Sequence, residues 1–470
     1  MKRVLLSLLI VSFPSLGCSA QQGGTVYEPV RFEDGTPVAG DAEAEALFAQ
    51  DRFLTDTTLT ERGDTLFVVR HASAYVRMQL DGLPAGIDQL SLVPMEGGIT
   101  RIPVSTPESG SLVLWMAREP GGQPAAAAIA QAPDGRVWSV RLPALALEPG
   151  TAYRWTGTLL PPEPLAADLK ATPLPARSLD IEPGEYSGIT RISGNRYAVV
   201  DDNLKGGGIL FFSIPIDAYG NVGTVRMQVA DGTATATGKA RDCEGIAFEP
   251  ASGTLYVASE NQEIRGYDLA GKETGKAFRI PKDLSVKNIT NNLGFEALTF
   301  DNAAGLFWTT TEAPLKDDTF LPRILRLQNF DRDGRPGERY LYQTGEPMRS
   351  SAGTQAYVFG VPALTALDDG RLLVLEREVY VPKGSFWDKL RDSFTKTDLY
   401  LVDPAHDSAG ILRKSLVCSF RTGATDLADF EGMCLGPTLP DGARTLLLIA
   451  DSQKGSGGWT KEYVKVILLR

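Results

Sequence analysis

The stretch "DCEGIAFEPASGTLYVASE", residues 242–260, has the form of a β-hairpin. Two short apolar runs flank a turn at Gly253, and each run is the length of one strand. Glu244 stands at the start of the first run, and Glu260 closes the second. The hairpin therefore has a carboxylate at both ends of its strand pair, which calls for an explanation.

The same design occurs again at residues 294–312, "GFEALTFDNAAGLFWTTTE". Glu296 and Glu312 are sixteen positions apart, as are the two glutamates of the first hairpin. Weaker copies are "YSGITRISGNRYAVVDDN" from 186, "GVPALTALDDGRLLVLERE" from 360 and "DFEGMCLGPTLPDGARTLLLIADS" from 429. Repetition of this kind indicates an architecture built from repeated supersecondary units.

Further strand-like segments, such as "GILFFSIPI" and "TDLYLVDP", follow most of these hairpins. Units of about fifty residues with four short strands are typical of a β-propeller. We therefore expect an all-β chain with a propeller at residues 178–470. Five repeats are visible, and the segment has room for a sixth blade.

The propeller explains the paired carboxylates. In an antiparallel blade the first strand begins, and the second strand ends, on the same face. Acids at these points should ring one mouth of the central channel, where they repel one another unless a cation intervenes, and oxygen ligands favour Ca²⁺. The alternative is that each acid caps a strand end through backbone hydrogen bonds. The predicted metal ligands are Glu244, Glu296, Glu431, Asp202, Glu260, Glu312, Glu376 and Asp451.

Basic residues occur in the loops on the same predicted face. Interleaved acids and bases suit a metal that bridges to a phosphate group held by Lys and Arg, although charged loops also serve solubility. The predicted substrate-binding residues are Arg241, Lys287, Lys316 and Lys454, and the predicted catalytic residues are Glu296, Glu244 and Arg377.

Composition narrows the functional classes. The chain of 470 residues has a net charge of −11 and a pI near 5.0, which argues against a nucleic-acid partner because such partners require a basic face. It contains two histidines, which argues against Ser-His-Asp and Cys-His nucleophile systems. Small molecules are the expected partners, and the oligomeric state is open.

The N-terminal segment reads as a targeting signal. "MKRVLLSLLIVSFPSLGC", residues 1–18, has a basic start and an apolar run too short to span a membrane as a mature helix. Cys18 follows Leu16-Gly17 as in a bacterial lipobox, although Ser15 stands where Leu is preferred. We expect lipidation at Cys18 and an outer-membrane lipoprotein that faces the periplasm or the cell surface, with the lipid as its sole membrane contact.

The middle of the chain divides into three parts. Residues 19–56 read as a polar tether with a short helix. Residues 57–160 alternate apolar and polar positions between Gly and Pro turns, which predicts a small β-sandwich, and "LEPGTAYRWTGTL" resembles fimbrillin-type, immunoglobulin-like modules. The Pro-rich residues 161–177 read as a stiff linker.

Three cysteines lie beyond the signal, at Cys243, Cys418 and Cys434. An odd number excludes a complete disulfide framework, and each lies in or beside an apolar strand. Buried free thiols are favoured, and one disulfide among the three is the alternative.

About 290 residues at the C-terminal end resemble a known family. The segments "NNLGFEALTFDNAAGLFWTTTEAPL", "GRLLVLERE", "TDLYLVDP" and "DFEGMCLGPTLPDGARTLLLIADS" are similar to the phytase-like, "esterase-like activity of phytase" family of exported bacterial proteins. The resemblance implies a propeller related to calcium-dependent phytases and hydrolysis of phosphate or other esters. Two departures weaken the pattern here: "SQKGSGGWTK" follows Asp451, and Pro362 replaces the Glu or Ser of the other repeats.

Together these features predict a surface-anchored, Ca²⁺-dependent hydrolase of phosphate esters in which the metal activates water at the channel mouth. Two alternatives stay open. One is a lactonase or esterase of the regucalcin kind, which would use a single divalent ion on three or four acids. The other is a propeller that binds a ligand or a protein without catalysis.

Overall fold

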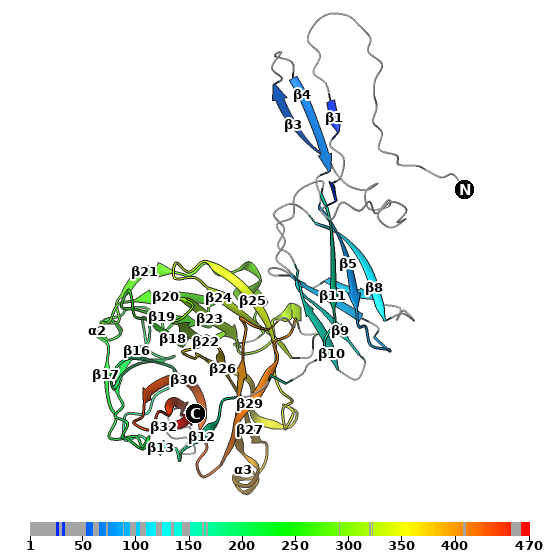
Figure 1. Cartoon of the computed structure of the whole chain (residues 1–470). Helices are drawn as coiled ribbons and strands as arrows, with labels where there is room; N and C mark the ends of the chain where they lie inside the picture. Colours follow the sequence, from blue (N-terminus) through cyan, green and yellow to red (C-terminus); the bar gives the residue numbers. More distant parts are fainter. Residues whose placement is uncertain are drawn as a thin grey trace, which may run out of the picture. The chain divides into compact units, whose positions relative to one another are not determined.

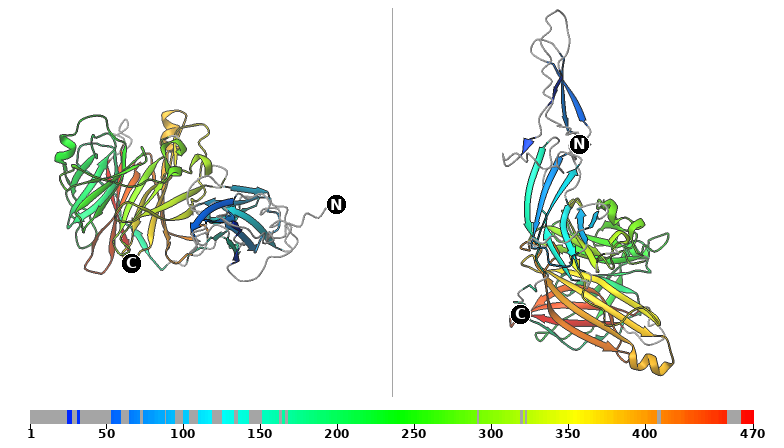
Figure 2. Two further views of the ribbon diagram at one scale, coloured as in Figure 1. Left: turned by 90° about the horizontal axis from the view of Figure 1, so that it is seen from above. Right: turned by 90° about the vertical axis from the view of Figure 1, so that its right-hand side faces the viewer.

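The computed structural model describes most of the C-terminal half of the chain and the strands of the N-terminal part (Figures 1 and 2). The described residues are 25–27, 31–32, 53–59, 65–71, 74–87, 89–94, 100–103, 110–118, 125–132, 136–142, 151–161, 164–165, 168–290, 292–318, 321, 323–407, 410–452 and 462–470. The chain divides into two compact units at residue 161. The expected signal, Cys18 and most of the tether lie outside the described residues.

The N-terminal unit contains a β-sandwich. One sheet has the order β10-β9-β6-β7 and the other β2-β11-β5-β8. Met78 and Leu80 from the second sheet pack against Leu90, Leu92 and Ala130 from the first, so the two sheets share one core. The strands are β2 (Arg31–Phe32), β5 (Ala74–Asp81), β6 (Gln89–Pro94), β7 (Thr100–Pro103), β8 (Ser111–Arg118), β9 (Ala125–Gln131), β10 (Val137–Arg141) and β11 (Thr151–Thr158).

Residues 57–59 and 65–71, at the start of the expected sandwich, lie in a different sheet. β3 (Phe53–Leu59) and β4 (Thr65–His71) form a separate three-stranded sheet with β1 (Thr25–Tyr27). The short helix expected in residues 19–56 lies mostly outside the described residues, and its last residues belong to β3. The sandwich proper therefore uses β2 and the strands from Ala74 onward.

The C-terminal unit is a propeller of five blades. The strands of the first three blades are β14 (Tyr186–Ser193), β15 (Arg196–Asp201), β16 (Ile209–Ser213), β17 (Arg226–Val229), β18 (Cys243–Glu249), β19 (Thr254–Ser259), β20 (Glu263–Tyr267), β21 (Glu273–Ala277), β22 (Phe295–Asp301), β23 (Leu306–Thr311), β24 (Ile324–Phe330) and β25 (Pro336–Gln343). Those of the last two are β26 (Thr354–Ala366), β27 (Leu372–Pro382), β28 (Phe394–Val402), β29 (Lys414–Gly423), β30 (Asp429–Thr438), β31 (Arg444–Asp451) and β32 (Tyr463–Leu469), with β12 (Ala171–Pro173) and β13 (Arg177–Ser178). The described residues leave no sixth blade.

The inner strands close a ring, since β14, β18, β22, β26 and β30 each pack against the next and β30 packs against β14. Second strands lie between neighbouring blades and are buried on both faces. In β15, Tyr197 and Val199 enter one apolar cluster, while Ala198 and Val200 enter another. Burial on both faces explains why these strands are continuous apolar runs rather than alternating ones.

The segment expected as a linker completes the last blade. β12 and β13 both pair antiparallel with β32, at Ala171↔Leu469 and Arg177↔Val464, and Figure 1 shows them beside it. The linker hypothesis for residues 161–177 is thus wrong for its second half. Pro-rich sequence did not prevent pairing, because an edge strand needs backbone donors on one side alone.

This pairing changes where the propeller can be cut. A protein that starts at Leu174 loses β12, so it should leave one edge of β32 unpaired and melt lower than one that starts at Pro162. Thermal denaturation of the two truncated proteins tests this. Equal melting temperatures would show that β12 contributes nothing to closure.

Helices are few and short in the described part of the chain. They are α2 (Asp231–Ala234), α3 (Phe386–Asp392) and the 3₁₀ turns η1 (Lys282–Leu284), η2 (Val286–Asn288) and η3 (Lys316–Asp318). Among the described residues, no helix has the length and apolar character needed to cross a membrane. Cys243, Cys418 and Cys434 are buried free thiols, as the sequence favoured.

Candidate metal centre

A β-bulge places a carboxylate at the start of three inner strands. In the second blade Cys243 pairs with Ser259 and the next partners are Ile246 and Val257, so Glu244 and Gly245 bulge out of the ladder. Glu296 and Glu431 occupy the same irregularity in their blades. Bulges re-aim side chains and are frequent at functional sites.

Small residues in these bulges bring the inner strands close together. A Cβ atom on Gly188 would lie 2.3 Å from the carbonyl oxygen of Glu244, and one on Gly245 would lie 2.7 Å from that of Glu296. At Gly432 the corresponding distance, to the Ser187 carbonyl oxygen, is 2.2 Å. Glycine is therefore required for the approach that crowds the acids at the axis.

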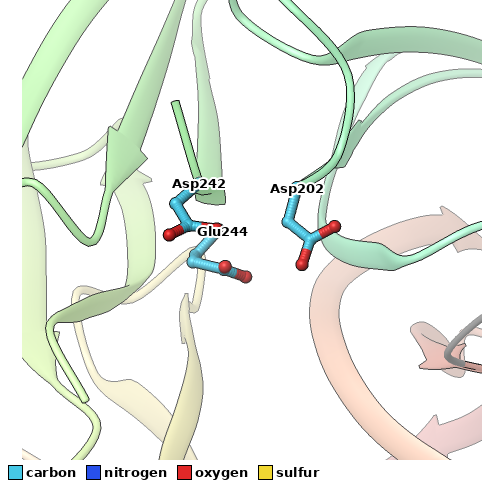
Figure 3. A group of neighbouring side chains, drawn as sticks. All are labelled: Asp202, Asp242 and Glu244. Carbon is cyan, nitrogen blue, oxygen red and sulfur yellow. The ribbon is translucent and has the colours of Figure 1, made fainter. Parts of the chain in front are cut away.

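Two groups of carboxylates have the spacing of a cation site. In one, Asp202, Asp242 and Glu244 each offer an oxygen, and these atoms all lie within 4.8 Å of one another. Figure 3 shows these side chains where the chain leaves β15 and enters β18. In the other, Glu244, Glu260 and Glu296 meet the same limit. Glu244 thus belongs to both groups, which makes it the centre of the acidic mouth.

Two further observations distinguish these acids from strand caps. The Oε2 atom of Glu260 is buried and has no hydrogen-bond partner among the described residues, although the residue is 9 % exposed. Asp242 has a φ of 54°, a left-handed conformation that costs an L-residue about 1–2 kcal/mol. An unsatisfied buried carboxylate oxygen and a strained backbone both indicate a site that is not optimised for stability alone.

Burial raises the pKa values of carboxyl groups in both triplets, which favours their protonated forms. It raises the pKa of Glu244 to about 7 against a lowering hydrogen bond from Ser187, and the charges of Asp242 and Glu312 add smaller contributions in the raising direction. Burial and the charge of Glu244 raise the pKa of Glu260 to about 8. Burial, with a contribution from Glu185, raises the pKa of Asp202 to about 9, and burial places the pKa of Glu296 well above its usual range. A cation would have to displace these protons.

The opposite side of the mouth carries its own positive charge. The Arg377 guanidinium contacts Glu312 at 2.9 Å, Asp429 at 2.6 Å and Glu431 at 2.9 Å. Arg377 is 5 % exposed, so these ion pairs form in a poorly screened environment. Arg377 of the fourth blade thus pairs with Glu312 of the third blade and with Asp429 and Glu431 of the fifth.

Residues 181–453 match the phytase-like family, described as esterase-like activity of phytase. The chain belongs to the phytase-like family. No curated protein sequence matches it. Among solved structures, the WD40 β-propeller domain of Doa1 is similar at 8 % identity with a TM-score of 0.29, over 64 % of this chain and 97 % of that one.

The fourth blade of this phytase-like propeller differs from the sequence prediction by one position. Gly360 pairs with Arg377, as Gly294 is bonded to Glu312 and Asp242 to Glu260. Arg377 therefore holds the ring position that was assigned to Glu376. A one-residue shift in a strand turns the side chain to the other face.

Glu376 is accordingly not a metal ligand. It accepts hydrogen bonds from the Tyr342 hydroxyl, from Lys414 Nζ at 2.5 Å and from the Gly345 amide at 2.8 Å. Arg377 is not placed to contact substrate either, because both Nη atoms bind carboxylates. We assign Arg377 a positioning role in place of the predicted catalytic one.

The other predicted ligands of the phytase-like site lie at the same mouth. Asp451 lies in register with Asp429, and burial with the charges of these two acids raises the pKa of Glu431. The charge of Glu312 likewise helps to raise the pKa values of Glu244 and Glu260. Sequence reasoning omitted from the ligand set an acid that stands at the start of three of the five inner strands. These residues are Glu185, Asp242 and Asp429, and their signal is the recurring pattern of an acid two positions before the bulge.

The predicted substrate-binding residues differ in their contacts and exposure. Arg241 Nη1 donates to the Tyr267 hydroxyl at 2.9 Å and to Glu273 at 3.0 Å. Its guanidinium group therefore binds residues of the second blade. Lys287 is exposed, and its carbonyl oxygen accepts a 3.1 Å bond from Lys316 Nζ. Lys454 lies outside the described residues.

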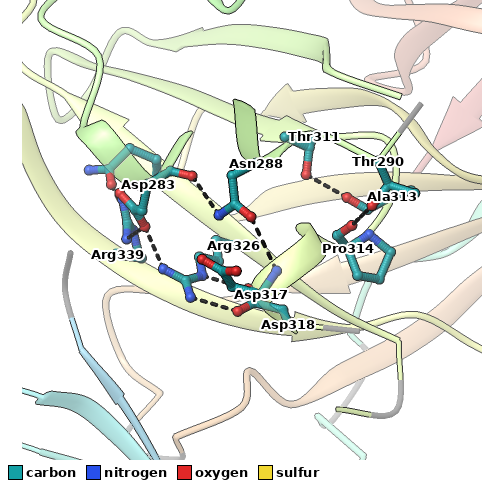
Figure 4. Close-up of polar contacts among 11 residues, drawn as sticks. Asp283, Asn288, Thr290, Thr311, Ala313, Pro314, Asp317, Asp318, Arg326 and Arg339 are labelled. Atoms are coloured by element: carbon teal, nitrogen blue, oxygen red, sulfur yellow. Dashed lines mark hydrogen bonds and ion pairs between the residues drawn. The ribbon is translucent and has the colours of Figure 1, made fainter. Parts of the chain in front are cut away.

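A buried ionic network fixes the loops that carry Lys287 and Lys316 (Figure 4). Arg326 bonds both carboxylate oxygens of Asp318, at 2.6 and 2.7 Å, and also reaches Asp283. Arg339 bonds Asp283 at 2.5 Å, and Asn288 links the two loops through Asp317. The loops adjoin the strands that bear Glu296 and Glu312, so the network holds the basic and acidic parts of the mouth in one rigid frame.

Stability without metal should depend on pH. The pKa values of Glu244, Glu260 and Asp202 lie near 7, 8 and 9 in the folded protein, above those of an unfolded chain. A raised pKa stabilises the fold below the unfolded pKa, and this contribution is lost as pH rises through the folded value. The metal-free protein should therefore melt progressively lower from pH 5 to pH 9, and excess Ca²⁺ should flatten the profile. A flat profile without Ca²⁺ would contradict the proposed crowding.

Proposed function

We propose that this chain is a Ca²⁺-dependent hydrolase of phosphate esters whose metal lies at the acidic mouth of the propeller. The observation that carries the proposal is the pair of carboxylate triplets that share Glu244. Membership of the phytase-like family supports an esterase- or phosphatase-like activity.

The donor set fits a hard cation. All five side chains, Asp202, Asp242, Glu244, Glu260 and Glu296, offer carboxylate oxygens, and Ca²⁺ takes six to eight such oxygens in flexible geometries. The buried Glu260 Oε2 atom has no other partner among the described residues, so a cation would satisfy it. When bound, Ca²⁺ would polarise a phosphoryl oxygen and lower the pKa of a ligating water.

The chain's own residues would prepare and orient the reactants. Arg377 pairs with Glu312, Asp429 and Glu431 and holds them in place, so these acids form a rigid wall. Lys287 and Lys316, on loops held by the Asp283 network, would bind phosphate oxygens as point charges.

The deciding experiment compares substrate classes. The purified protein is assayed against a phosphate monoester, a phosphate diester, a lactone and a carboxyl ester, each with Ca²⁺ and with a chelator. We expect Ca²⁺-dependent release of phosphate from the monoester. Turnover confined to the lactone would favour the regucalcin-like alternative, and no turnover with any substrate would favour a binding propeller.

We further propose that the chain is exported and anchored by a lipid on Cys18, on the strength of the lipobox-like "SLGC" at residues 15–18. A Cys18→Ser protein cannot accept the thioether-linked lipid, so it should move from the membrane fraction to the soluble fraction. Immunoblotting of both fractions measures this. A variant that stays with the membrane would contradict the anchor.

A further inference from the structure

The propeller has a second concave site at the other end of its channel. A cavity of about 670 Å³ is lined by the ends of all five inner strands and the turns that follow them. We call this cavity the funnel. Between the funnel and the acidic mouth the axis narrows to a space of about 10 Å³ beside Glu296 and Glu431, which is room for about one water molecule. A ligand in the funnel is therefore separate from the metal site.

Part of the funnel wall is apolar. Its lining includes Ile246, Phe248, Leu298, Phe300 and Met433, supplied by three different blades. Large apolar side chains around a cavity of this size are the usual setting for binding a small organic molecule. An apolar part of a ligand would gain about 25 cal/mol for each Å² removed from water.

The charged residues of the funnel are two arginines and one aspartate: Arg191, Arg444 and Asp368. Asp368 is a weak partner, because its side chain is 78 % exposed and lies 3.5 Å from Arg444. The Nε atom of Arg444 is buried and has no hydrogen-bond partner among the described residues. Arg191 binds the carbonyl oxygens of Gly194 and Gly436, and within the described part of the chain it forms no ion pair. Arg444 Nη1 donates to the Thr438 hydroxyl at 3.0 Å, so the exposed Asp368 carboxylate is the one counter-charge that pairs with either guanidinium group within the described residues.

Neighbouring groups do not supply a further counter-charge. The charges of Arg191 and Arg444 act on Cys434, yet burial raises its thiol pKa to about 12, so it stays neutral. The same two arginines act electrostatically on the Tyr197 hydroxyl. This hydroxyl is buried and has no hydrogen-bond partner among the described residues. In a protein of net charge −11, two arginines that share one exposed aspartate beside a partly apolar cavity are complementary to an anion.

We propose that the funnel binds a small organic anion with an apolar body. Its carboxylate or phosphate group would lie against Arg191 and Arg444, and its apolar part would contact the wall around Leu298 and Phe300. Phosphate and carboxylate share the geometry that a guanidinium recognises. The site is independent of the proposed hydrolase activity, since it uses none of the acids at the opposite mouth.

The test is a calorimetric titration of the full chain with octanoate, octyl phosphate and octanol, in the presence and absence of Ca²⁺. We expect both anions to bind and octanol to bind with an affinity at least about tenfold lower. Ca²⁺ should change neither result. The charge-assisted contacts to the two arginines should together account for the difference of about tenfold in affinity. Tighter binding of octyl phosphate would identify a phosphate ligand, and tighter binding of octanoate a carboxylate ligand.

Variants locate the site. Arg191→Met with Arg444→Met should reduce anion affinity to that of octanol, and Thr190→Trp, which fills the lining, should abolish binding of all three probes. Arg226→Met is the matched control, because Arg226 is exposed on the outer strand β17 and does not line the funnel. Circular dichroism checks that each variant is folded. No binding by the wild type, equal affinity for octanol and octanoate, or unchanged binding in a folded Thr190→Trp protein would overturn the proposal.

Discussion

Replacing Glu244 by Gln should remove Ca²⁺-dependent turnover and most of the Ca²⁺-induced rise in melting temperature. Glu244 belongs to both carboxylate triplets, so one substitution weakens every oxygen set at the mouth. With Ca²⁺ at about 100 times its Kd, the ion would stabilise the wild type by about 2.7 kcal/mol, and the variant should lose nearly all of this. Differential scanning calorimetry with Ca²⁺ and with a chelator measures the change.

The metal-free state provides the sharper comparison. Gln removes a charge that raises the pKa of Glu260 and Glu296, so the variant without Ca²⁺ should melt at the same temperature as the wild type or higher. A strand cap predicts the reverse, a lower melting temperature with and without Ca²⁺ and an unchanged shift between them. Glu263→Gln is the matched control, since Glu263 lies in the same blade and pairs with Arg265 away from the axis.

The second large effect is expected for Arg377→Met. This change leaves Glu312, Asp429 and Glu431 buried without their cation, and removing one partner of a buried ion pair costs about 3–5 kcal/mol. A cost of that size lowers the melting temperature by about 10 °C in a domain of this class. The loss should be larger at pH 9 than at pH 5, because protonation of the three carboxyls relieves their repulsion at low pH.

The response to Ca²⁺ shows whether Arg377 stabilises the fold through its charge or through packing. Without Arg377 the three carboxylates become another set of oxygen ligands, so excess Ca²⁺ should restore part of the lost melting temperature and raise the bound stoichiometry. Arg377→Lys should be milder than Arg377→Met, since it keeps the charge and loses the forked geometry. Arg371→Met serves as the control, because Arg371 pairs with the exposed Asp168 and Asp369. Equal destabilisation at every pH, with no response to Ca²⁺, would show that Arg377 acts through packing alone.

Local sequence determined most of the fold. The apolar runs, the turn glycines and the regular return of the Glu-Gly and Glu-Ala pairs are properties of single hairpins, so the propeller and the face that bears its acids could be predicted. The same pattern identified Glu244, Glu260, Glu296 and Glu312 in advance. These conclusions needed the strand period and the direction of each strand, both of which are local.

The tertiary structure alone decided three other points. Residues 161–177 read as a linker because their pairing partner, β32, lies nearly three hundred residues away, and non-local pairing leaves no local mark. Arg377, rather than Glu376, faces the axis because the bulge near Pro362 sets the register of the whole strand. The division of the mouth into an acidic side around Glu244 and a side held by Arg377 arises from contacts among all five blades. The sequence specifies which charges are present, while ring closure determines which of them are close enough to bind a cation or to neutralise one another.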